Sequence, residues 1–318
     1  MSLKVASLFA GIGGIDLGFN QAGFEIVWAN ELDSAACKTY RANFDDERCL
    51  VEGDIRTINP ESIPNIDVLV AGFPCQPFSI ASKQAGFNDR RGNLFFEIAK
   101  VIDVKRPAVI FLENVKNLIE HDNGRTFLVI YNSLAQFGYY VKYKVLNALD
   151  YGNVPQNRER IFIVAFRDYE QCKKFEFPQP LKLSSKLFEI IDRTIQKPNY
   201  YYYNNTVYYP ILNQAITDSE CVYKFTDINV RKSRRGICPT LTANMGTFPN
   251  RVPIIKDNYG IRKMTPMECL SLQGFPKDFT FSKEIKIEEA YKQAGNTVCV
   301  PVVKKIAEEI KDSFINKV

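Results

Sequence analysis

Short apolar runs alternate with amphipathic segments through the first half of the chain. The runs have the length of buried strands and are bounded by residues that end such elements, chiefly Gly, Asn and Asp. We expect strands at residues 3–9, 24–29, 67–71, 108–112, 139–148 and 161–166. Helices are expected to end before Gly23, to begin after Asp33, and to cover residues 94–104 and 126–136. This alternation predicts an α/β fold with a Rossmann-like, doubly wound and mostly parallel sheet.

The pattern changes near residue 171, where the periodicity fades. Tyrosines at 199–205 stand near prolines, and we expect them to form an ordinary strand of a smaller, irregular domain. The chain becomes regular again from residue 262, and the stretch 293–298 is expected to open a terminal helix at 302–314. The expected organisation is a first domain over 1–174, a smaller domain over 175–260, and a returning segment over 261–318 whose terminal helix packs on the first domain.

Composition excludes several classes of protein. No apolar run approaches the ~18 residues that a membrane span needs. The start of the chain shows no cationic leader, so we expect a cytoplasmic protein. The eight cysteines are scattered without a Cys-x-x-Cys pair, which indicates reduced thiols instead of disulfides or a metal site. The single histidine, His121, lies in a polar stretch and is expected to be exposed.

Positive charge is concentrated in one part of the chain. Residues 171–262 carry 14 Lys and Arg against 7 Asp and Glu, whereas the net charge of the whole chain is +5. Such an asymmetry suits a surface that faces polyanions such as nucleic acid. A solvated basic face would give the same pattern, and charge alone does not separate the two interpretations.

A cysteine between two prolines, Pro74-Cys75-Gln76-Pro77, follows the expected strand at 67–71. Both prolines fix φ and neither donates a backbone hydrogen bond, so we expect a stiff loop at the carboxyl edge of the sheet. Open α/β sheets bind ligands at that edge, which would present the thiol for chemistry. The alternative is a small buried hydrophobe, as most free cysteines are. The polar stretch 82–93, which contains two glycines, suits a mobile lid.

A glycine-rich turn, Phe9-Ala10-Gly11-Ile12-Gly13-Gly14, leads from the first strand into the first helix. Asp16 stands where a dinucleotide fingerprint has its third glycine, which favours a nucleoside ligand without phosphates. Glu31 follows Gly11 by 20 residues, at the end of the second strand, where an acidic residue can bind ribose hydroxyls. The pair Asp54-Ile55 could offer a purine one carboxylate and one apolar wall.

Two further motifs carry charge at strand ends. Glu113 ends the very apolar strand at 108–112, and a carboxylate is costly there unless it serves a partner. Arg158 and Arg160 precede the strand at 161–166, and their spacing predicts that they share one face. They could equally be surface ion-pair partners.

Together these motifs resemble those of the cytosine-5 DNA methyltransferases, particularly the single-chain bacterial modification enzymes. The resemblance covers nearly the whole chain in the family's order: residues 9–13, 31, 54, 74–76, 113–115, 156–160, 262–276 and 295–298. It implies the fold of S-adenosylmethionine-dependent methyltransferases, with a cofactor-binding catalytic domain and a smaller target-recognition domain. In the variable segment at about 175–260, only Thr240-Leu241 is readily matched.

The resemblance also implies roles for single residues. The catalytic residues would be Cys75, Glu113, Arg158 and Arg160. The S-adenosylmethionine site would comprise Phe9, Gly11, Ile12, Gly13, Gly14, Glu31, Leu32, Asp54, Ile55, Pro74 and Asn296. Candidate DNA contacts are Gln76, Ser79, Arg91, Arg234, Arg235, Thr240, Leu241, Asn244 and Arg251.

In the implied reaction Cys75 adds to cytosine C6, Glu113 binds N3 and the exocyclic amine, and Arg160 contacts O2. Arg158 would support the loop or contact a phosphate, and the base would be flipped out of the duplex. The implied partner is double-stranded DNA. The resemblance also implies a monomer that binds no metal and no membrane. Such an enzyme would act near the nucleoid and be paired with a restriction endonuclease.

Other functions remain as alternatives. Leu32 replaces an aromatic residue of some members, which weakens one expected contact to adenine. A branch of the family methylates transfer RNA, but its Cys-Phe-Thr tripeptide is absent from the variable segment. A cysteine hydrolase would have to use His121 as its only histidine. A pure DNA-binding module would not need Cys75.

Overall fold

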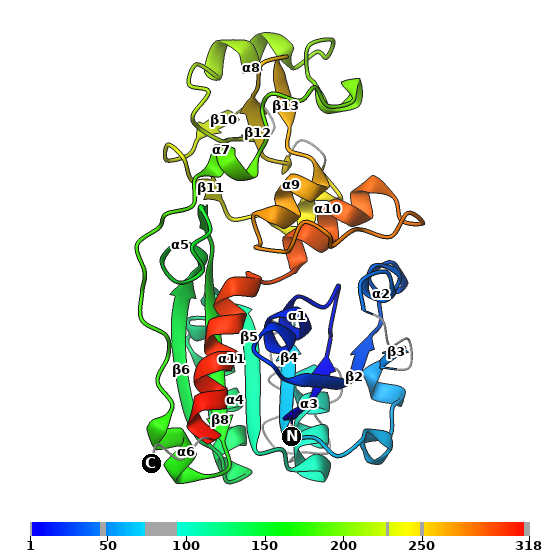
Figure 1. Cartoon of the computed structure of the whole chain (residues 1–318), viewed down its shortest axis with the longest axis vertical. Helices are drawn as coiled ribbons and strands as arrows, with labels where there is room; N and C mark the ends of the chain where they lie inside the picture. Colours follow the sequence, from blue (N-terminus) through cyan, green and yellow to red (C-terminus); the bar gives the residue numbers. More distant parts are fainter. Residues whose placement is uncertain (1, 45–48, 74–93, 227–228, 249–250, 315–318) are drawn as a thin grey trace.

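The computed structural model describes residues 2–44, 49–73, 94–226, 229–248 and 251–314. Its larger domain is built on a seven-stranded sheet with the order β3-β2-β1-β4-β5-β8-β6 (Figure 1). The strands are β1 (Lys4–Leu8), β2 (Glu25–Glu31), β3 (Leu50–Glu52), β4 (Val68–Gly72), β5 (Val109–Val115), β6 (Tyr140–Asn147) and β8 (Glu159–Phe166). The strands from β3 to β5 pair parallel, and β8 pairs antiparallel with both β5 and β6. The expected α/β fold with a mostly parallel sheet is confirmed.

Helices cover both faces of this sheet. They are α1 (Gly14–Gln21), α2 (Ser34–Arg41), α3 (Leu94–Lys105), α4 (Arg125–Gln136), α5 (Ala148–Tyr151), α6 (Tyr169–Lys174) and α11 (Val300–Phe314). Alternate residues of a strand point to opposite faces. In β5, Val109 and Phe111 therefore join the core beneath α1 and α11, while Ile110 and Leu112 join the core beneath α3 and α4. The side chain of Asp33 caps α2, as expected, by accepting from the Ala35 and Ala36 amides.

The smaller domain has a four-stranded sheet with the order β10-β9-β12-β13. Its elements are β9 (Tyr223–Thr226), β10 (Asn229–Lys232), β12 (Ile254–Lys256), β13 (Ile261–Lys263), α7 (Leu187–Ile190) and α8 (Tyr209–Ala215). A short parallel pair, β7 (Gln156–Asn157) with β11 (Cys238–Pro239), joins the two domains. Because β13 pairs with β12, the small sheet includes residues on both sides of the boundary expected at 260.

The tyrosine run is not the strand we expected. Residues Asn199–Tyr201 form a 3-10 turn that follows Pro198, and only the next two residues run alongside β13. Tyr202 makes an isolated bridge to Arg262, and the Tyr203 amide donates to the Ile261 carbonyl at 2.9 Å. The turn buries Tyr201 and Tyr203 and leaves Tyr200 exposed.

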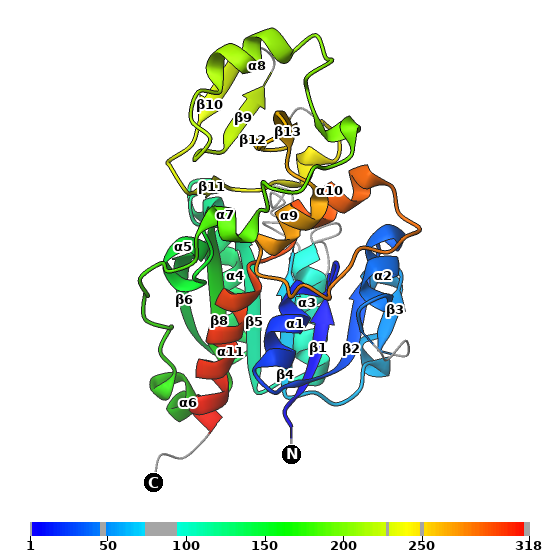
Figure 2. The same ribbon diagram turned by 45° about the horizontal axis from the view of Figure 1, so that its top comes forward.

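The returning segment contains α9 (Pro266–Ser271), α10 (Ile287–Asn296) and α11. The stretch 293–298 ends α10 instead of opening the terminal helix, because the chain leaves helical geometry at Thr297 before α11 begins. Helices α9 and α10 lie between the two sheets, and α11 packs on α1 (Figure 2). At Gly295, helix α10 packs closely against the backbone of Thr242. A Cβ at residue 295 would lie 2.2 Å from the Thr242 carbonyl carbon, so only glycine fits there. Among the described residues, no helix has both the length and the hydropathy to cross a bilayer.

Candidate active site

A cavity of about 710 Å³ lies at the carboxyl ends of the parallel strands, beneath the end of α10. Open α/β sheets bind their ligands at this edge. The cavity brings together most of the residues that the sequence predicted: Phe9, Gly11, Ile12, Gly14, Glu31, Leu32, Asp54, Ile55, Glu113, Arg160 and Asn296. Gly13 does not line it. Gly13 is the N-cap of α1 at φ 84°, and a Cβ there would clash with the rings of Phe44 and Tyr40.

Glu31 fixes the glycine-rich turn as well as facing the cavity. One carboxylate oxygen accepts from the Gly11 amide, and the other accepts from the Leu32 and Asp33 amides, each at 2.8 Å. A carboxylate offers about four acceptor positions, so one position remains for a ligand hydroxyl. The sequence predicted the contact with a ligand but not this internal role.

Asp16 explains why the third glycine of a dinucleotide motif is missing. Its buried carboxyl accepts from the hydroxyls of Ser7 and Tyr40 and so connects α1 with β1 and α2. Burial raises the pKa of Asp16 to about 6, although the two hydrogen bonds lower the pKa by a smaller amount. In this chain the position is therefore occupied by the buried Asp16 side chain, which holds the first turn of α1. A dinucleotide motif has a glycine there, so that the helix can lie close to a pyrophosphate.

One end of the cavity combines carboxylate with apolar surface. Asp54 accepts from the backbone and guanidinium of Arg56, which lowers the pKa of Asp54 to about 2. Ile55, the next residue, is buried, while Leu32 is 64% exposed and lines the same cavity. An exposed leucine beside an ionised carboxylate suits a planar ligand that has both an apolar face and donor groups.

Glu113 and Arg160, which also line the cavity, form an ion pair. Their side chains are 11% and 15% exposed, and Arg160 Nε lies 3.1 Å from Glu113 Oε1. Burial raises the pKa of Glu113, and the charges of Arg160 and Arg158 oppose this effect. In the register of β4 with β5, Gly72 stands beside Glu113, and Gly72 and Phe73 also line the cavity.

Phe73, which lines the cavity, directly precedes the segment that contains the predicted nucleophile. Asn114 Nδ2 donates to the Phe73 carbonyl at 2.8 Å, which fixes the last residue described before that segment. The predicted residues Pro74, Cys75, Gln76, Ser79 and Arg91, and the expected lid at 82–93, lie outside the described residues.

Arg158 does not share a face with Arg160, contrary to the prediction. The chain turns between β7 and β8, so Arg158 points inward with 2% of its surface exposed. Its guanidinium donates to the carbonyls of Leu241 at 2.7 Å, Gly295 at 3.1 Å and Thr297 at 2.5 Å. Burial lowers the pKa of Arg158 to about 9. Arg158 therefore supports the cavity wall and does not reach a DNA phosphate.

Replacing Arg158 by Met should destabilise the fold, because three buried carbonyls would lose a charged donor. We expect the free energy of unfolding to fall by about 2–4 kcal/mol. Arg160→Met is the matched control and should change it by less than about 1 kcal/mol, since Glu113 can take up a proton. Urea denaturation followed by circular dichroism measures both; equal losses in the two variants would contradict this assignment.

The predicted DNA contacts fall into different environments. Leu241 is fully buried in the core between the domains, so the prediction that it contacts DNA is wrong. Thr240 donates to the Asn157 carbonyl at 2.6 Å, and Asn244 is hydrogen-bonded to Thr242. Arg235 is exposed, as is Arg251, whose guanidinium lies 4.6 Å from the Phe248 ring centre.

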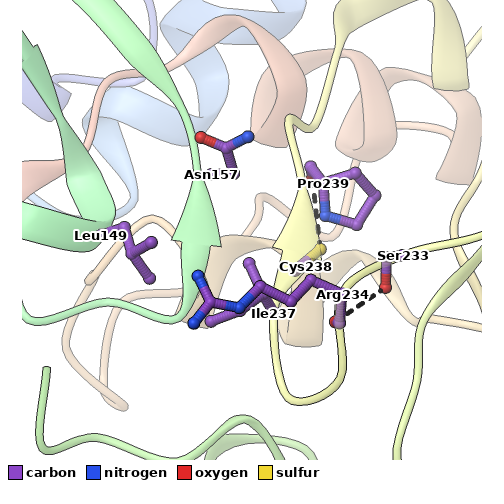
Figure 3. Close-up of a pocket in the computed structure, with 7 residues that line it drawn as sticks. All are labelled: Leu149, Asn157, Ser233, Arg234, Ile237, Cys238 and Pro239. Atoms are coloured by element: carbon purple, nitrogen blue, oxygen red, sulfur yellow. Dashed lines mark hydrogen bonds between the residues drawn. The ribbon is translucent and has the colours of Figure 1, made fainter.

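Arg234 lines a second, smaller cavity of about 320 Å³ beside the β7–β11 pair (Figure 3). Leu149, Asn157, Ile237 and Pro239 contribute to the same cavity. It is separate from the cavity at the sheet edge, since the two share no lining residue.

Sequence reasoning missed several residues that line the larger cavity: Phe73, Leu94, Thr242, Ala243, Lys292, Gln293 and Thr297. The stretch 293–298 was visible as a motif, but its role as a cavity wall depends on the break between α10 and α11. His121 lies outside the cavity lining, and it is partly buried with Nδ1 hydrogen-bonded to Thr126 Oγ1 at 2.7 Å. The geometry therefore gives no support to a Cys-His hydrolase.

Comparison with known proteins agrees with this geometry. The model of the C-5 cytosine-specific DNA methylase family matches residues 3–312. Type II methyltransferase M.Bsp6I of Bacillus sp. (strain RFL6) is 50% identical over 317 residues, which cover 98% of this chain and 100% of that protein. Type II methyltransferase M.HaeII of Haemophilus aegyptius is 41% identical over 311 residues, with coverages of 98% and 93%. The crystal structure of a Spodoptera frugiperda DNMT2 mutant has a TM-score of 0.75 at 21% identity, covering 98% of this chain and 100% of that chain, which shows a shared fold. The chain belongs to the C-5 cytosine-specific DNA methylase family.

Proposed function

We propose that the chain transfers a methyl group from S-adenosylmethionine to carbon 5 of a cytosine flipped out of double-stranded DNA, with Cys75 as nucleophile. Its family makes it a DNA cytosine methyltransferase that needs a methyl donor. One observation carries the finer proposal: the Glu113–Arg160 pair faces the cavity beside Gly72, three residues before Cys75. An acid and a cation at this place can bind one pyrimidine edge.

The residues of the larger cavity fit S-adenosylmethionine. Its volume of about 710 Å³ lies within the range of small-molecule sites. Glu31 has an acceptor position for a ribose hydroxyl, and Asp54 can accept from the adenine amine beside Leu32 and Ile55. When bound, S-adenosylmethionine supplies an electrophilic methyl group, and the cavity wall at Asn296 would hold its amino-acid end.

The chain's own groups supply the remaining chemistry. The Cys75 thiolate would form a bond to cytosine C6, which makes C5 nucleophilic. Glu113, whose pKa is raised by burial, would donate its proton to N3 as negative charge develops, while Arg160 binds O2. After C5 takes the methyl group, loss of the C5 proton to a base restores the C5–C6 double bond and expels the Cys75 thiolate, and the N3 proton returns to Glu113.

The direct test compares two nucleic acids. The purified full-length chain should label duplex DNA from methyl-tritiated S-adenosylmethionine, and it should leave transfer RNA at background. A duplex that contains 5-fluorocytosine at the target should trap a covalent adduct, because fluorine at C5 blocks the final elimination. Preferential labelling of transfer RNA would favour the alternative activity. If the enzyme methylates the unmodified duplex but forms no adduct on the 5-fluorocytosine duplex, the Cys75 mechanism is overturned.

We further propose that the chain acts as a monomer in the cytoplasm, at the nucleoid. Both relatives are named Type II methyltransferases, which supports pairing with a restriction endonuclease that recognises the same sequence. Bisulfite sequencing of DNA from a host that expresses the chain would identify the sequence and the methylated cytosine.

A further inference from the structure

The smaller cavity beside the β7–β11 pair holds a guanidinium that no described residue neutralises. Among the described residues that line it, only Arg234 carries a charge. Figure 3 shows its side chain extending beside Ile237 toward Leu149. In the part of the chain that the structure describes, Arg234 is hydrogen-bonded through its carbonyl oxygen and not through its guanidinium. By contrast, Lys232 is paired with Asp218 at 3.0 Å. The cavity therefore offers a positive charge to a ligand.

The backbone at Arg234 is fixed by a tight turn. Its carbonyl accepts from the Ile237 amide at 3.1 Å and from the Ser233 hydroxyl at 3.3 Å. Inside the turn, Gly236 adopts φ 69°, and its amide donates to the Glu220 carbonyl at 2.9 Å. A backbone that is already ordered lowers the entropy lost when the side chain takes up a ligand. The turn therefore holds the base of the Arg234 side chain ready for binding.

Two short stretches of chain connect this cavity to the larger one. Asn157 lines the smaller cavity, and Arg160 lines the larger one. Pro239 and Thr242 stand in the same relation on the second stretch. Three residues of extended chain span at most about 11 Å. The two cavities are therefore close neighbours, although they share no lining residue.

The smaller cavity lies on the side of β7 that faces away from α9 and α10. Gln156 donates to the Leu272 carbonyl at 2.6 Å, directly after α9. Arg158 donates to the Gly295 carbonyl in α10 at 3.1 Å. Successive residues of a strand point to opposite faces, so Asn157 between them faces the other side, where it lines the cavity. A ligand can approach on this side without displacing either helix.

A DNA phosphate fits the chemistry of this cavity. A guanidinium binds phosphate through parallel hydrogen bonds, and the uncharged deoxyribose suits the neighbouring apolar side chains of Leu149, Ile237 and Pro239. Base edges lie inside the grooves of a duplex, whereas phosphates lie on its outside, where a side chain that lies along a cavity wall can reach them. A distance of about 11 Å corresponds to about three nucleotides at 3.4 Å each.

We propose that the smaller cavity binds a backbone phosphate of the DNA through Arg234, within about three nucleotides of the target cytosine. This inference rests on the proposed function, which places the target base at Glu113 and Arg160. Arg234 thus anchors the duplex beside the larger cavity, and it does not read the sequence.

Salt-dependent binding of two duplexes to the full-length chain tests the proposal, followed by fluorescence anisotropy over a series of KCl concentrations. One duplex is alternating A·T without cytosine, and the other contains the sequence that bisulfite sequencing identifies. Arg234→Met should weaken binding of both duplexes about threefold to tenfold at ~0.1 M salt. The slope of log K against log salt should become shallower by about one, because one phosphate contact no longer releases counterions. A loss confined to the second duplex would overturn the proposal, since it would show base reading.

Arg235→Met is the matched control, because it removes the same charge from the next residue, which is exposed and does not line the cavity. It should weaken binding of the A·T duplex by less than about twofold and keep the wild-type slope. Arg234→Lys keeps the charge and should also keep that slope. If Arg234→Met changes neither affinity nor slope, or if Arg235→Met changes both equally, the proposal is overturned. If the wild type methylates no DNA, the proposed function fails instead, and the A·T duplex still tests the phosphate contact.

Discussion

Cys75→Ser is expected to reduce methyl transfer to duplex DNA by about 10³-fold or more. A serine hydroxyl stays protonated near neutral pH, and it cannot replace the thiolate that must add to C6. The rate is measured with tritiated S-adenosylmethionine and saturating duplex. The same variant should form no covalent adduct with 5-fluorocytosine DNA on a denaturing gel.

Two controls separate loss of chemistry from loss of fold. Cys172→Ser changes a cysteine on α6, outside the cavity lining, and should retain methyl transfer within about twofold. Cys75→Ser should still bind S-adenosylhomocysteine as the wild type does. Substantial methyl transfer by Cys75→Ser, in a protein that binds normally, would rule out the covalent mechanism.

Glu113→Gln is expected to lower the rate by about 10²- to 10⁴-fold, the usual contribution of a general acid. The amide keeps the shape of the side chain, but it cannot give up a proton as the thiolate adds. The protonated form of Glu113 is populated below its raised pKa, so the wild-type rate should fall as pH rises through that pKa. Glu113→Gln should lack this part of the pH profile.

The profile is measured as kcat over a pH series with saturating DNA. Asp150→Asn, on α5 and outside the cavity lining, is a control carboxylate that should leave the profile unchanged. A pH profile that persists in Glu113→Gln would show that another group supplies the proton.

The first domain was largely predictable because buried parallel strands are apolar runs with polar ends. For β5, the run at 108–112 located the strand, but pairing with β8 continues through Glu113, Asn114 and Val115. Polar residues that stay in a strand have no signature in the hydrophobic pattern. They remain in β5 because the antiparallel partner satisfies their backbone groups.

Long-range contacts limited the rest of the prediction. Spacing alone placed Arg158 and Arg160 on one face, yet three carbonyls from distant segments draw Arg158 inward. The family resemblance placed Leu241 at the DNA, and its burial between the domains depends on the same contacts. The pattern located the terminal helix but not α10, so the stretch 293–298 was interpreted as the start of a helix although it ends one.

The contact of Gly295 with Thr242 has a consequence for exchanging segments between relatives. The backbone of residues 242–243 touches the last turn of α10 too closely to accept even one methyl group. A segment from another protein that replaces these residues must therefore bring a backbone that fits equally closely against Gly295. Because β9 and β12 pair across this point of the chain, a chimaera joined here would also have to rebuild the small sheet.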